Sequence, residues 1–447
     1  MADRRCATDG RGKRNGPLSA HPLADQFQVA RSALVKRHIG GLIAKTAGFN
    51  VAAAAAAALG GVAIARTVGP AVRGEYAAVT AWFGLLLIVG GVGQPAAVCF
   101  HVARNPGRAR GYVATSRAMM LVTGAIALTA GLVVAPVLAH GHPGLAGAYR
   151  IAFAGSALAF VGASYTSSLQ ATSTPRWNFV RVSQPVLALA AILLLRRIHL
   201  LTLDTALGVL IATMAIQLGY AYYWCRRSKL APGHARVHLI RPLMRYGLAQ
   251  IAALAPSAVN AYLDQLVLSQ LVPPADLGRY AIAVSITLVP VPLVSAIGNV
   301  AFPRLAASRA IPAAGRGLPL TALLVSAVTA SAILVPIAAI AFWLIPEVFG
   351  PAYRGAVPLL WILTPGGIFL ACSGVVGDLL RGLGQPGRVA VAQGLAAVFT
   401  VILLFALLPS TGVAAAAIAS TVSYGVALAV MIRWLWRRDL TEGNSCG

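Results

Sequence analysis

The chain alternates long apolar blocks with short turns that are polar or basic. Most of the apolar blocks are about twenty residues long, the length that an α-helix needs to cross the hydrocarbon core of a bilayer. Twelve blocks are expected, at about residues 40–65, 75–100, 118–139, 145–170, 180–195, 201–224, 246–271, 277–302, 319–345, 357–380, 388–408 and 412–434. The fifth and sixth are short and share a basic turn, so the count is open by one pair. The pattern predicts an all-α polytopic membrane protein with about twelve transmembrane helices.

Composition agrees with this prediction. Of the 447 residues, 58% are hydrophobic and only 11% are charged, whereas soluble domains carry roughly 25% charged residues. A water-soluble fold is therefore excluded. The 5 cysteines are odd in number and lack C-x-x-C spacing, so neither a disulfide framework nor a metal site is expected.

The basic residues are distributed unevenly between the two sets of turns. The chain has 36 Lys and Arg against 11 Asp and Glu, a net charge of +25. If the N-terminus is cytoplasmic, 28 basic residues face the cytoplasm, 7 face the other side and one, Lys45, lies within the first span. This is the positive-inside pattern, so we expect a multi-pass protein of the cytoplasmic (inner) cell membrane with both termini cytoplasmic. Basic residues in such turns bind anionic lipids, and no nucleic-acid-binding module is present.

The second half of the chain resembles the first. Residues 73–77 (RGEYA) match residues 277–281 (LGRYA) at an offset of 204, and the longest internal basic loop separates the halves. We expect a disordered tail at 1–39, a six-helix lobe at 40–224, a linker at 225–245, a second six-helix lobe at 246–434 and a tail at 435–447. Two lobes in the same orientation predict a pseudo-twofold axis along the membrane normal and a central cavity. Such a layout suits alternating access.

Several short motifs resemble polysaccharide flippases (Wzx-like) of the multidrug/oligosaccharidyl-lipid/polysaccharide (MOP) exporter superfamily, which also holds the MATE-like exporters. They are Tyr246-Gly247-Leu248, Leu263-Asp264-Gln265-Leu266, Ala301-Phe302-Pro303-Arg304, Phe349-Gly350-Pro351-Ala352-Tyr353, Leu380-Arg381-Gly382-Leu383-Gly384 and Leu408-Pro409-Ser410-Thr411-Gly412, with Ala65-Arg66-Thr67-Val68-Gly69-Pro70 in the first half. Together they cover most of residues 40–434.

The resemblance implies a transporter, not an enzyme, with no catalytic residues and no bound cofactor. Its implied cargo is a lipid-linked (polyprenyl pyrophosphate) oligosaccharide repeat unit, flipped from the inner to the outer leaflet for surface polysaccharide biosynthesis and export. Implied further partners are a polysaccharide polymerase and glycosyltransferases.

Ionisable residues within apolar blocks are costly and therefore functional candidates. Asp264, about seven residues from the outer end of its span, can take up a proton or a sodium ion during transport. Asp378 lies three residues before Arg381, where an i,i+3 ion pair is the simpler reading. Lys45 can either reach the membrane interface or attract a pyrophosphate in the cavity. The amides of Asn50, Gln250, Asn260 and Gln393 suit sugar hydroxyls as well as hydrogen bonds between helices.

Two further groups of charges are candidates at the membrane surfaces. Cytoplasmic arginines can gather the pyrophosphate, although topology and lipid binding also explain them: Arg104, Arg108, Arg110, Arg181, Arg241 and Arg245. Glu75 and Arg279 occupy equivalent places in the two halves and have opposite charge. We expect them to meet at the outer mouth and to act as a gate in the inward-open state.

Two other functions compete with the flippase. A cation-coupled MATE-type exporter of small drugs or metabolites would use the same fold, but the first six spans lack acidic residues except at their ends. A membrane-embedded glycosyltransferase or polymerase would need paired acidic residues or a large outer loop, and the outer acidic residues are scattered singly. A basic chain suits an anionic pyrophosphate, yet the sequence shows no mid-span arginine to hold one.

Overall fold

The computed structural model describes residues 22–295, 317–383 and 385–442, all of whose regular elements are helices. The chain forms two units, Met1–Thr46 and Ala47–Gly447. The expected tails fall partly outside the described residues, as does the end of the eighth span. The helix α1 begins at Pro22, where proline at the start is followed by good helix formers, and the division of the chain into tails, lobes and linker stays a prediction. Residues 435–442 are helical as well, as the end of α14.

The helix α1 (Pro22–Gly90) is two helices joined at a kink. Gly69 has a left-handed φ of 76°, and Pro70 follows it, so the helical hydrogen bonding is interrupted there. The apolar part, Lys45–Gly90, has 46 residues, or about 70 Å of helix, more than twice the thickness of the hydrocarbon core. It therefore supplies two membrane crossings.

Twelve spans follow from the helices. Within the described residues, ten helices are long and apolar enough to cross a membrane, or eleven with the bent α7, and the kinked α1 counts twice. The bounds after α1 are α2 Gln94–Arg104, α3 Ala109–Leu138, α4 Pro143–Thr172, α5 Thr174–Arg197, α6 Leu203–Arg227, α7 Ile240–Leu271, α8 Pro274–Thr287, α10 Gly317–Ala339, α11 Ala341–Phe349, α12 Ala356–Gly382, α13 Pro386–Thr411 and α14 Ala414–Glu442. The expected all-α membrane fold is confirmed.

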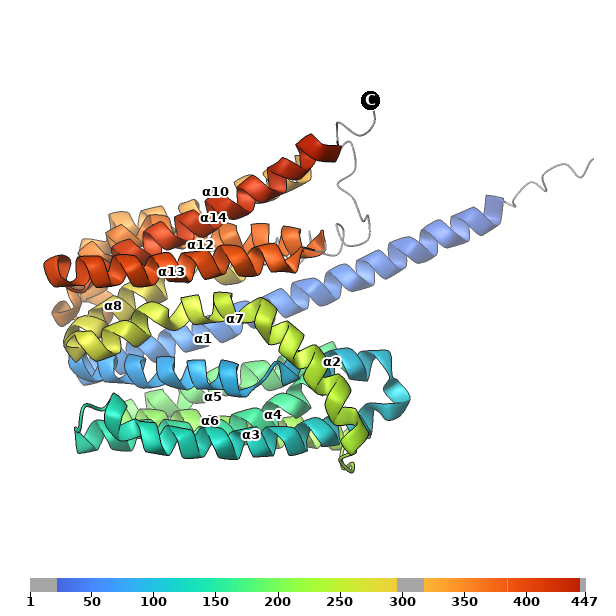
Figure 1. The fold of residues 1–447 in the computed structure, drawn as a ribbon, viewed down its shortest axis with the longest axis horizontal. Helices are drawn as coiled ribbons and strands as arrows, with labels where there is room; N and C mark the ends of the chain where they lie inside the picture. Colours follow the sequence, from blue (N-terminus) through green and yellow to red (C-terminus); the bar gives the residue numbers. More distant parts are fainter. Residues whose placement is uncertain (1–21, 296–316, 384, 443–447) are drawn as a thin grey trace, which may run out of the picture. The chain divides into compact units, whose positions relative to one another are not determined.

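The helices of the second unit pack in two groups, which we call the N-lobe (residues 47–227) and the C-lobe (255–436). In the N-lobe, α4 packs against α2, α3, α5 and α6; in the C-lobe, α14 packs against α12 and α13, and α12 against α8 and α10 (Figure 1). The helix α7 belongs to both groups. It bends by 48° between Ala252 and Ala255, close to Pro256, a residue that removes a backbone donor. Its first part contacts α2 and α3, whereas the helix also packs on α13.

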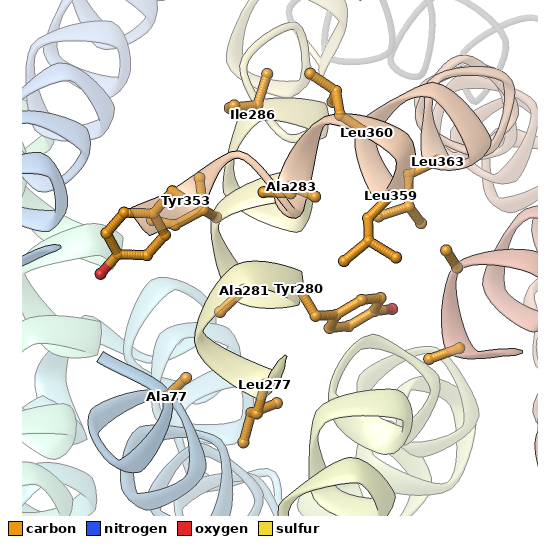
Figure 2. Close-up of a cluster of buried hydrophobic side chains, with 14 of the residues drawn as sticks. Ala77, Leu277, Tyr280, Ala281, Ala283, Ile286, Tyr353, Leu359, Leu360 and Leu363 are labelled. Carbon is orange, nitrogen blue, oxygen red and sulfur yellow. The ribbon is translucent and has the colours of Figure 1, made fainter. Parts of the chain in front are cut away.

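A buried apolar cluster joins the lobes at the end of the bundle that the charges predict to be outer. Ala65, Ala77 and Ala78 of α1 belong to the same cluster as Leu277 and Ala281 of α8. Figure 2 shows Ala77 beside Leu277 and Tyr353 on the same side of α8, whereas Leu359, Leu360 and Leu363 of α12 lie on the other side. Small side chains on both helices allow their backbones to approach closely.

Candidate functional site

The C-lobe contains a cavity of about 380 Å³ between α7, α8, α12, α13 and α14, which we call the C-lobe cavity. Its wall combines leucine and valine with a large set of polar side chains. The polar members are Ser257, Asn260, Tyr262, Asp264, Gln265, Tyr280, Thr287, Ser373, Arg381, Gln393, Ser420 and Tyr424. Two of the predicted candidates, Asp264 and Asn260, therefore face one space, together with Gln393.

Asp264 is held by hydroxyl groups. One carboxylate oxygen accepts a hydrogen bond from the Tyr280 hydroxyl and another from the Ser420 hydroxyl at 3.3 Å. The other oxygen accepts from the backbone N–H of Gln265 at 2.7 Å. The residue is only 3% exposed, and its partners come from α7, α8 and α14. No ion pair joins it to a basic side chain of the described chain.

Asn260 lies one helical turn before Asp264 and binds α13. Its amide nitrogen donates to the Gln393 side-chain oxygen at 3.4 Å, and its oxygen accepts from the Thr400 hydroxyl at 3.3 Å. The i,i+4 spacing puts Asn260 and Asp264 on one face of α7. The two networks together connect α7 with α8, α13 and α14.

This arrangement can hold a small cation. A desolvated carboxylate without a basic partner is costly within a membrane, and a proton or a hard cation removes that cost. Hard cations prefer oxygen ligands, which Asp264, Tyr280, Ser420 and Asn260 supply here. Among the residues that the structure describes, no group of three or more His, Cys, Asp or Glu could hold a metal ion.

The other predicted candidates do not line this cavity. Asp378 forms the expected i,i+3 ion pair at 2.8 Å with Arg381, which does line it. Gln250 is in the first part of α7, and Asn50 is half-buried in α1. Lys45 is exposed and belongs to the N-terminal unit.

The predicted cytoplasmic arginines have separate neighbours. Arg104 lies over the Phe100 ring and lines a second cavity, of about 720 Å³, between α2, α4 and α7. Arg181 stacks over Trp177 at 4.3 Å, and Arg110 donates to the Lys229 carbonyl at 2.5 Å. Another three, Arg108, Arg241 and Arg245, are exposed.

Glu75 and Arg279, the residues of the expected gate, form no ion pair with each other in this structure. Arg279 instead forms an ion pair with Asp276 at 2.8 Å and donates to the Ala352 carbonyl at 3.5 Å. Asp276 lies three residues earlier on the same helix, so it reaches the guanidinium without help from the other lobe.

The lobes are instead closed at this end by backbone contacts. A Cβ atom added to Gly74 would overlap the Pro274 carbonyl and lie 2.9 Å from the Gly278 nitrogen. One added to Gly278 would overlap the Pro70 carbonyl and lie 3.0 Å from the Gly74 nitrogen. We call this contact the Pro-Gly crossing. Both Pro70/Pro274 and Gly74/Gly278 are separated by 204 residues, which is the offset of the internal repeat.

The sequence does not predict the roles of three polar residues at these sites, Tyr280, Ser420 and Arg73. Tyr280 belongs to the repeat motif, but the motif does not indicate that its hydroxyl contacts Asp264. Ser420 lies in a run of small residues, which explains it without a role in the site. Arg73 was assigned to an outer turn because the second span was expected to start at Glu75. The structure begins that helix at Pro70, which puts Arg73 within it.

Comparisons with known proteins agree on the fold. A family model described as polysaccharide biosynthesis protein matches residues 43–309. An inward-facing multidrug resistance MATE family transporter of the MOP superfamily shares 13% identity with a TM-score of 0.74, covering 88% of this chain and 96% of its own. A Pyrococcus furiosus MOP superfamily transporter, described as having a binding pocket of reverse polarity that suggests a different function, shares 14% identity with a TM-score of 0.63, covering 89% and 95%. No curated protein sequence matches the chain.

Proposed function

Because the chain belongs to the polysaccharide biosynthesis protein family, we propose that it flips a lipid-linked (polyprenyl pyrophosphate) oligosaccharide repeat unit from the inner to the outer leaflet. The multi-pass fold is that of MOP superfamily transporters. The observation that carries the proposal is the pairing of this family match with two equivalent lobes that close directly on each other at one end. To move a large head group across the membrane, two such lobes would have to open and close in turn on its two sides.

The contacts between the lobes support alternating access. At the predicted outer end, the lobes touch through the Pro-Gly crossing and through a hydrogen bond from the Tyr353 hydroxyl to the Ala65 carbonyl at 3.1 Å. At the predicted cytoplasmic end, the 720 Å³ cavity is lined by Arg104 and Tyr246. We place the approach of the anionic head group there, where an arginine can donate charge-assisted hydrogen bonds to phosphate oxygens.

Asp264 is the proposed coupling residue. Uptake of a proton or a sodium ion neutralises its carboxylate and changes what Tyr280 and Ser420 contact. Those two residues lie on α8 and α14, so neutralisation alters the contacts among three spans of the C-lobe. A bound ion shifts the equilibrium between inward-open and outward-open states only if it interacts differently with the two.

A second candidate function is export of small drugs or metabolites coupled to a cation. The MATE transporters among the structural neighbours favour it, as does a carboxylate in the C-lobe cavity. The two functions differ in the charge of the cargo. An anionic pyrophosphate suits the basic lining near Arg104, whereas an organic cation would need Asp264.

The test is the fate of lipid-linked precursors in cells that lack the chain. We expect these precursors to accumulate on the cytoplasmic side of the cytoplasmic membrane while surface polysaccharide disappears, with the polymerase and glycosyltransferases still present. Wild-type protein should restore the polymer and Asp264→Asn should not. The control is Asp378→Asn, which removes a half-exposed carboxylate that already has a partner. Normal polysaccharide with altered sensitivity to organic cations would favour the exporter.

A further inference from the structure

The N-lobe contains its own cavity of about 550 Å³, between the two parts of α1 and the helices α5 and α6. We call it the N-lobe cavity. Most of its wall is aliphatic and built from small residues of α1. The residues that line it are Ala53, Ala54, Ala56, Ala57, Gly60, Gly61, Ile64, Arg73, Tyr76, Gln184, Pro185, Ala188, Leu189, Ile192 and Leu210.

This cavity is the counterpart of the C-lobe cavity in the internal repeat. At the offset of 204, eight of its lining residues correspond to eight that line the C-lobe cavity. In order, Ala53, Ala56, Ala57, Gly60, Gly61, Tyr76, Pro185 and Leu189 correspond to Ser257, Asn260, Ala261, Asp264, Gln265, Tyr280, Val389 and Gln393. The fifth helix of each repeat also contributes a glutamine to its cavity, Gln184 on α5 and Gln393 on α13, although the two glutamines stand at different places in the repeat. The two cavities therefore occupy equivalent positions in the two repeats.

The two cavities differ in the charge that they hold. Gly60 and Ala56 stand where the C-lobe has Asp264 and Asn260, so the N-lobe cavity has no carboxylate among its lining residues. It has Arg73 instead, whose equivalent in the C-lobe is the apolar Leu277. The carboxylate of Asp264 thus belongs to the C-lobe cavity alone. Both cavities have a guanidinium, but that of Arg381 in the C-lobe cavity is paired with Asp378, whereas Arg73 has no acidic partner.

Arg73 lacks the partners that a guanidinium inside a membrane protein needs. Its Nε atom is buried and has no hydrogen-bond partner among the described residues. The ion pairs found there, both on other helices, do not include it. Its one ring contact is with Tyr76, whose ring centre lies 5.6 Å from the guanidinium carbon. A half-buried guanidinium with an unpaired, buried Nε atom is costly within a membrane protein, so the residue is suited to an anion that enters the cavity.

We propose that the N-lobe cavity binds an anion of the phosphate class through Arg73. The planar guanidinium presents several N–H groups that match phosphate oxygens. The proposal rests on the proposed function, in which the anion is the pyrophosphate of the lipid-linked sugar. Arg73 directly precedes Gly74 of the Pro-Gly crossing, so an anion bound there lies beside the contact that must open for release.

The experiment measures binding to the purified full-length protein in detergent, by calorimetry. The probes are inorganic pyrophosphate and a short-chain polyprenyl pyrophosphate, with a polyprenyl alcohol of the same length as the uncharged control. The variants are Arg73→Gln, Arg73→Lys and the control Arg66→Gln, which removes an exposed arginine from the same helix.

We expect wild-type protein to bind the polyprenyl pyrophosphate and Arg73→Gln to bind it about tenfold to a hundredfold more weakly, as for loss of a charged hydrogen bond. Arg73→Lys should be intermediate, and Arg66→Gln should be unchanged. Without ligand, Arg73→Gln should unfold at the wild-type temperature or above it, whereas a purely structural arginine would give a lower temperature.

Two results overturn the inference: wild-type protein that binds neither pyrophosphate, or Arg73→Gln that binds as tightly as wild type. In either case, accumulation of the precursors in cells that lack the chain would leave the flippase proposal standing. Binding of inorganic pyrophosphate alone, lost in Arg73→Gln, would support the anion site and assign it to a free anion instead of the lipid.

Discussion

Gly74 of α1 and Gly278 of α8 lie backbone against backbone, and each is the equivalent of the other in the internal repeat. A residue that meets its own equivalent lies at the pseudo-twofold axis. The prolines one turn earlier, Pro70 and Pro274, each contribute the carbonyl that the opposite glycine approaches. The Pro-Gly crossing is therefore the point where the two lobes meet most closely at the predicted outer end.

Gly74→Ala should destabilise this closed arrangement. The added methyl group would overlap the Pro274 carbonyl, and overpacking of this kind costs about 1 to 3 kcal/mol. The measurement is labelling of an introduced cysteine, Ala77→Cys, by a maleimide that does not cross membranes. Ala77 is 2% exposed in this structure, so it should be protected alone and labelled when combined with Gly74→Ala.

The control for this experiment is Gly147→Ala on α4, where an added methyl group meets nothing within 4 Å. It should leave Ala77→Cys protected, since an open position in a helix accepts alanine well. Equal labelling with and without Gly74→Ala would show that the crossing does not close the outer end.

Tyr353→Phe should weaken the same closure by removing one hydrogen bond between the lobes. The Tyr353 hydroxyl donates to the Ala65 carbonyl at 3.1 Å, and a bond of this kind contributes about 1 kcal/mol, or about a fivefold change in population. Labelling of Ala77→Cys should rise accordingly. Tyr220→Phe, at an exposed tyrosine of α6, should have no effect.

The effect of Tyr353→Phe should not depend on pH between 6 and 9. Burial raises the pKa of Tyr353 to about 12, whereas an unfolded tyrosine titrates near 10. A raised pKa means that the contribution of the hydroxyl is complete below about pH 10 and is lost as the pH rises through 12. A difference that vanished between pH 6 and 9 would assign the closure to another group.

Reversing the charges of Glu75 and Arg279 together should not restore any stability that is lost when either charge is reversed alone. Arg279 is bound to Asp276, so a double-mutant cycle for Glu75 and Arg279 should give a coupling energy near zero. The cycle for Asp276 and Arg279 should give about 0.2 to 1 kcal/mol, as for exposed pairs. Thermal unfolding of the purified variants measures both, and the reverse order of coupling would restore the gate expected from the sequence.

Asn260→Leu should lower the stability of the C-lobe. The change leaves the Gln393 oxygen and the Thr400 hydroxyl without the partner that they have now, and buried polar groups that lose a partner cost about 1 to 3 kcal/mol. Thermal unfolding should shift downward by several degrees. Asn50→Leu, at a half-buried position of α1, should shift it less, and equal shifts would argue against the network.

The sequence predicts the architecture well because membrane crossing depends on local hydrophobicity. Long apolar blocks, basic turns and the offset of 204 are visible without any contact information. The turn between the first two spans is visible too, but its shortness is not: the chain turns at Gly69 alone and the next helix begins at Pro70, whereas hydropathy alone places that start at residue 75. That difference moved Arg73 from a turn into the N-lobe cavity.

The candidate site is predicted only in part for a similar reason. Asp264 and Asn260 are visible as polar residues on one helix. Their partners come from α8, α13 and α14, and Ser420 is 156 residues away from Asp264.

The repeat also predicts which ends of the helices meet, but not which side chains. Gly74 meets Gly278 at the axis, whereas the next residues, Glu75 and Arg279, are turned by about 100° around their helices. Asp276 then satisfies Arg279, and its equivalent in the first half is Val72.

The most direct test of the central claim is flipping by the purified protein in liposomes. A lipid-linked oligosaccharide is placed in both leaflets, and a glycosidase outside the liposomes reports which molecules become accessible with time. The account predicts that wild-type protein exposes the inner pool, that Asp378→Asn behaves similarly and that Asp264→Asn does not. An inner pool that stays protected with wild-type protein under both proton and sodium gradients would contradict the flippase.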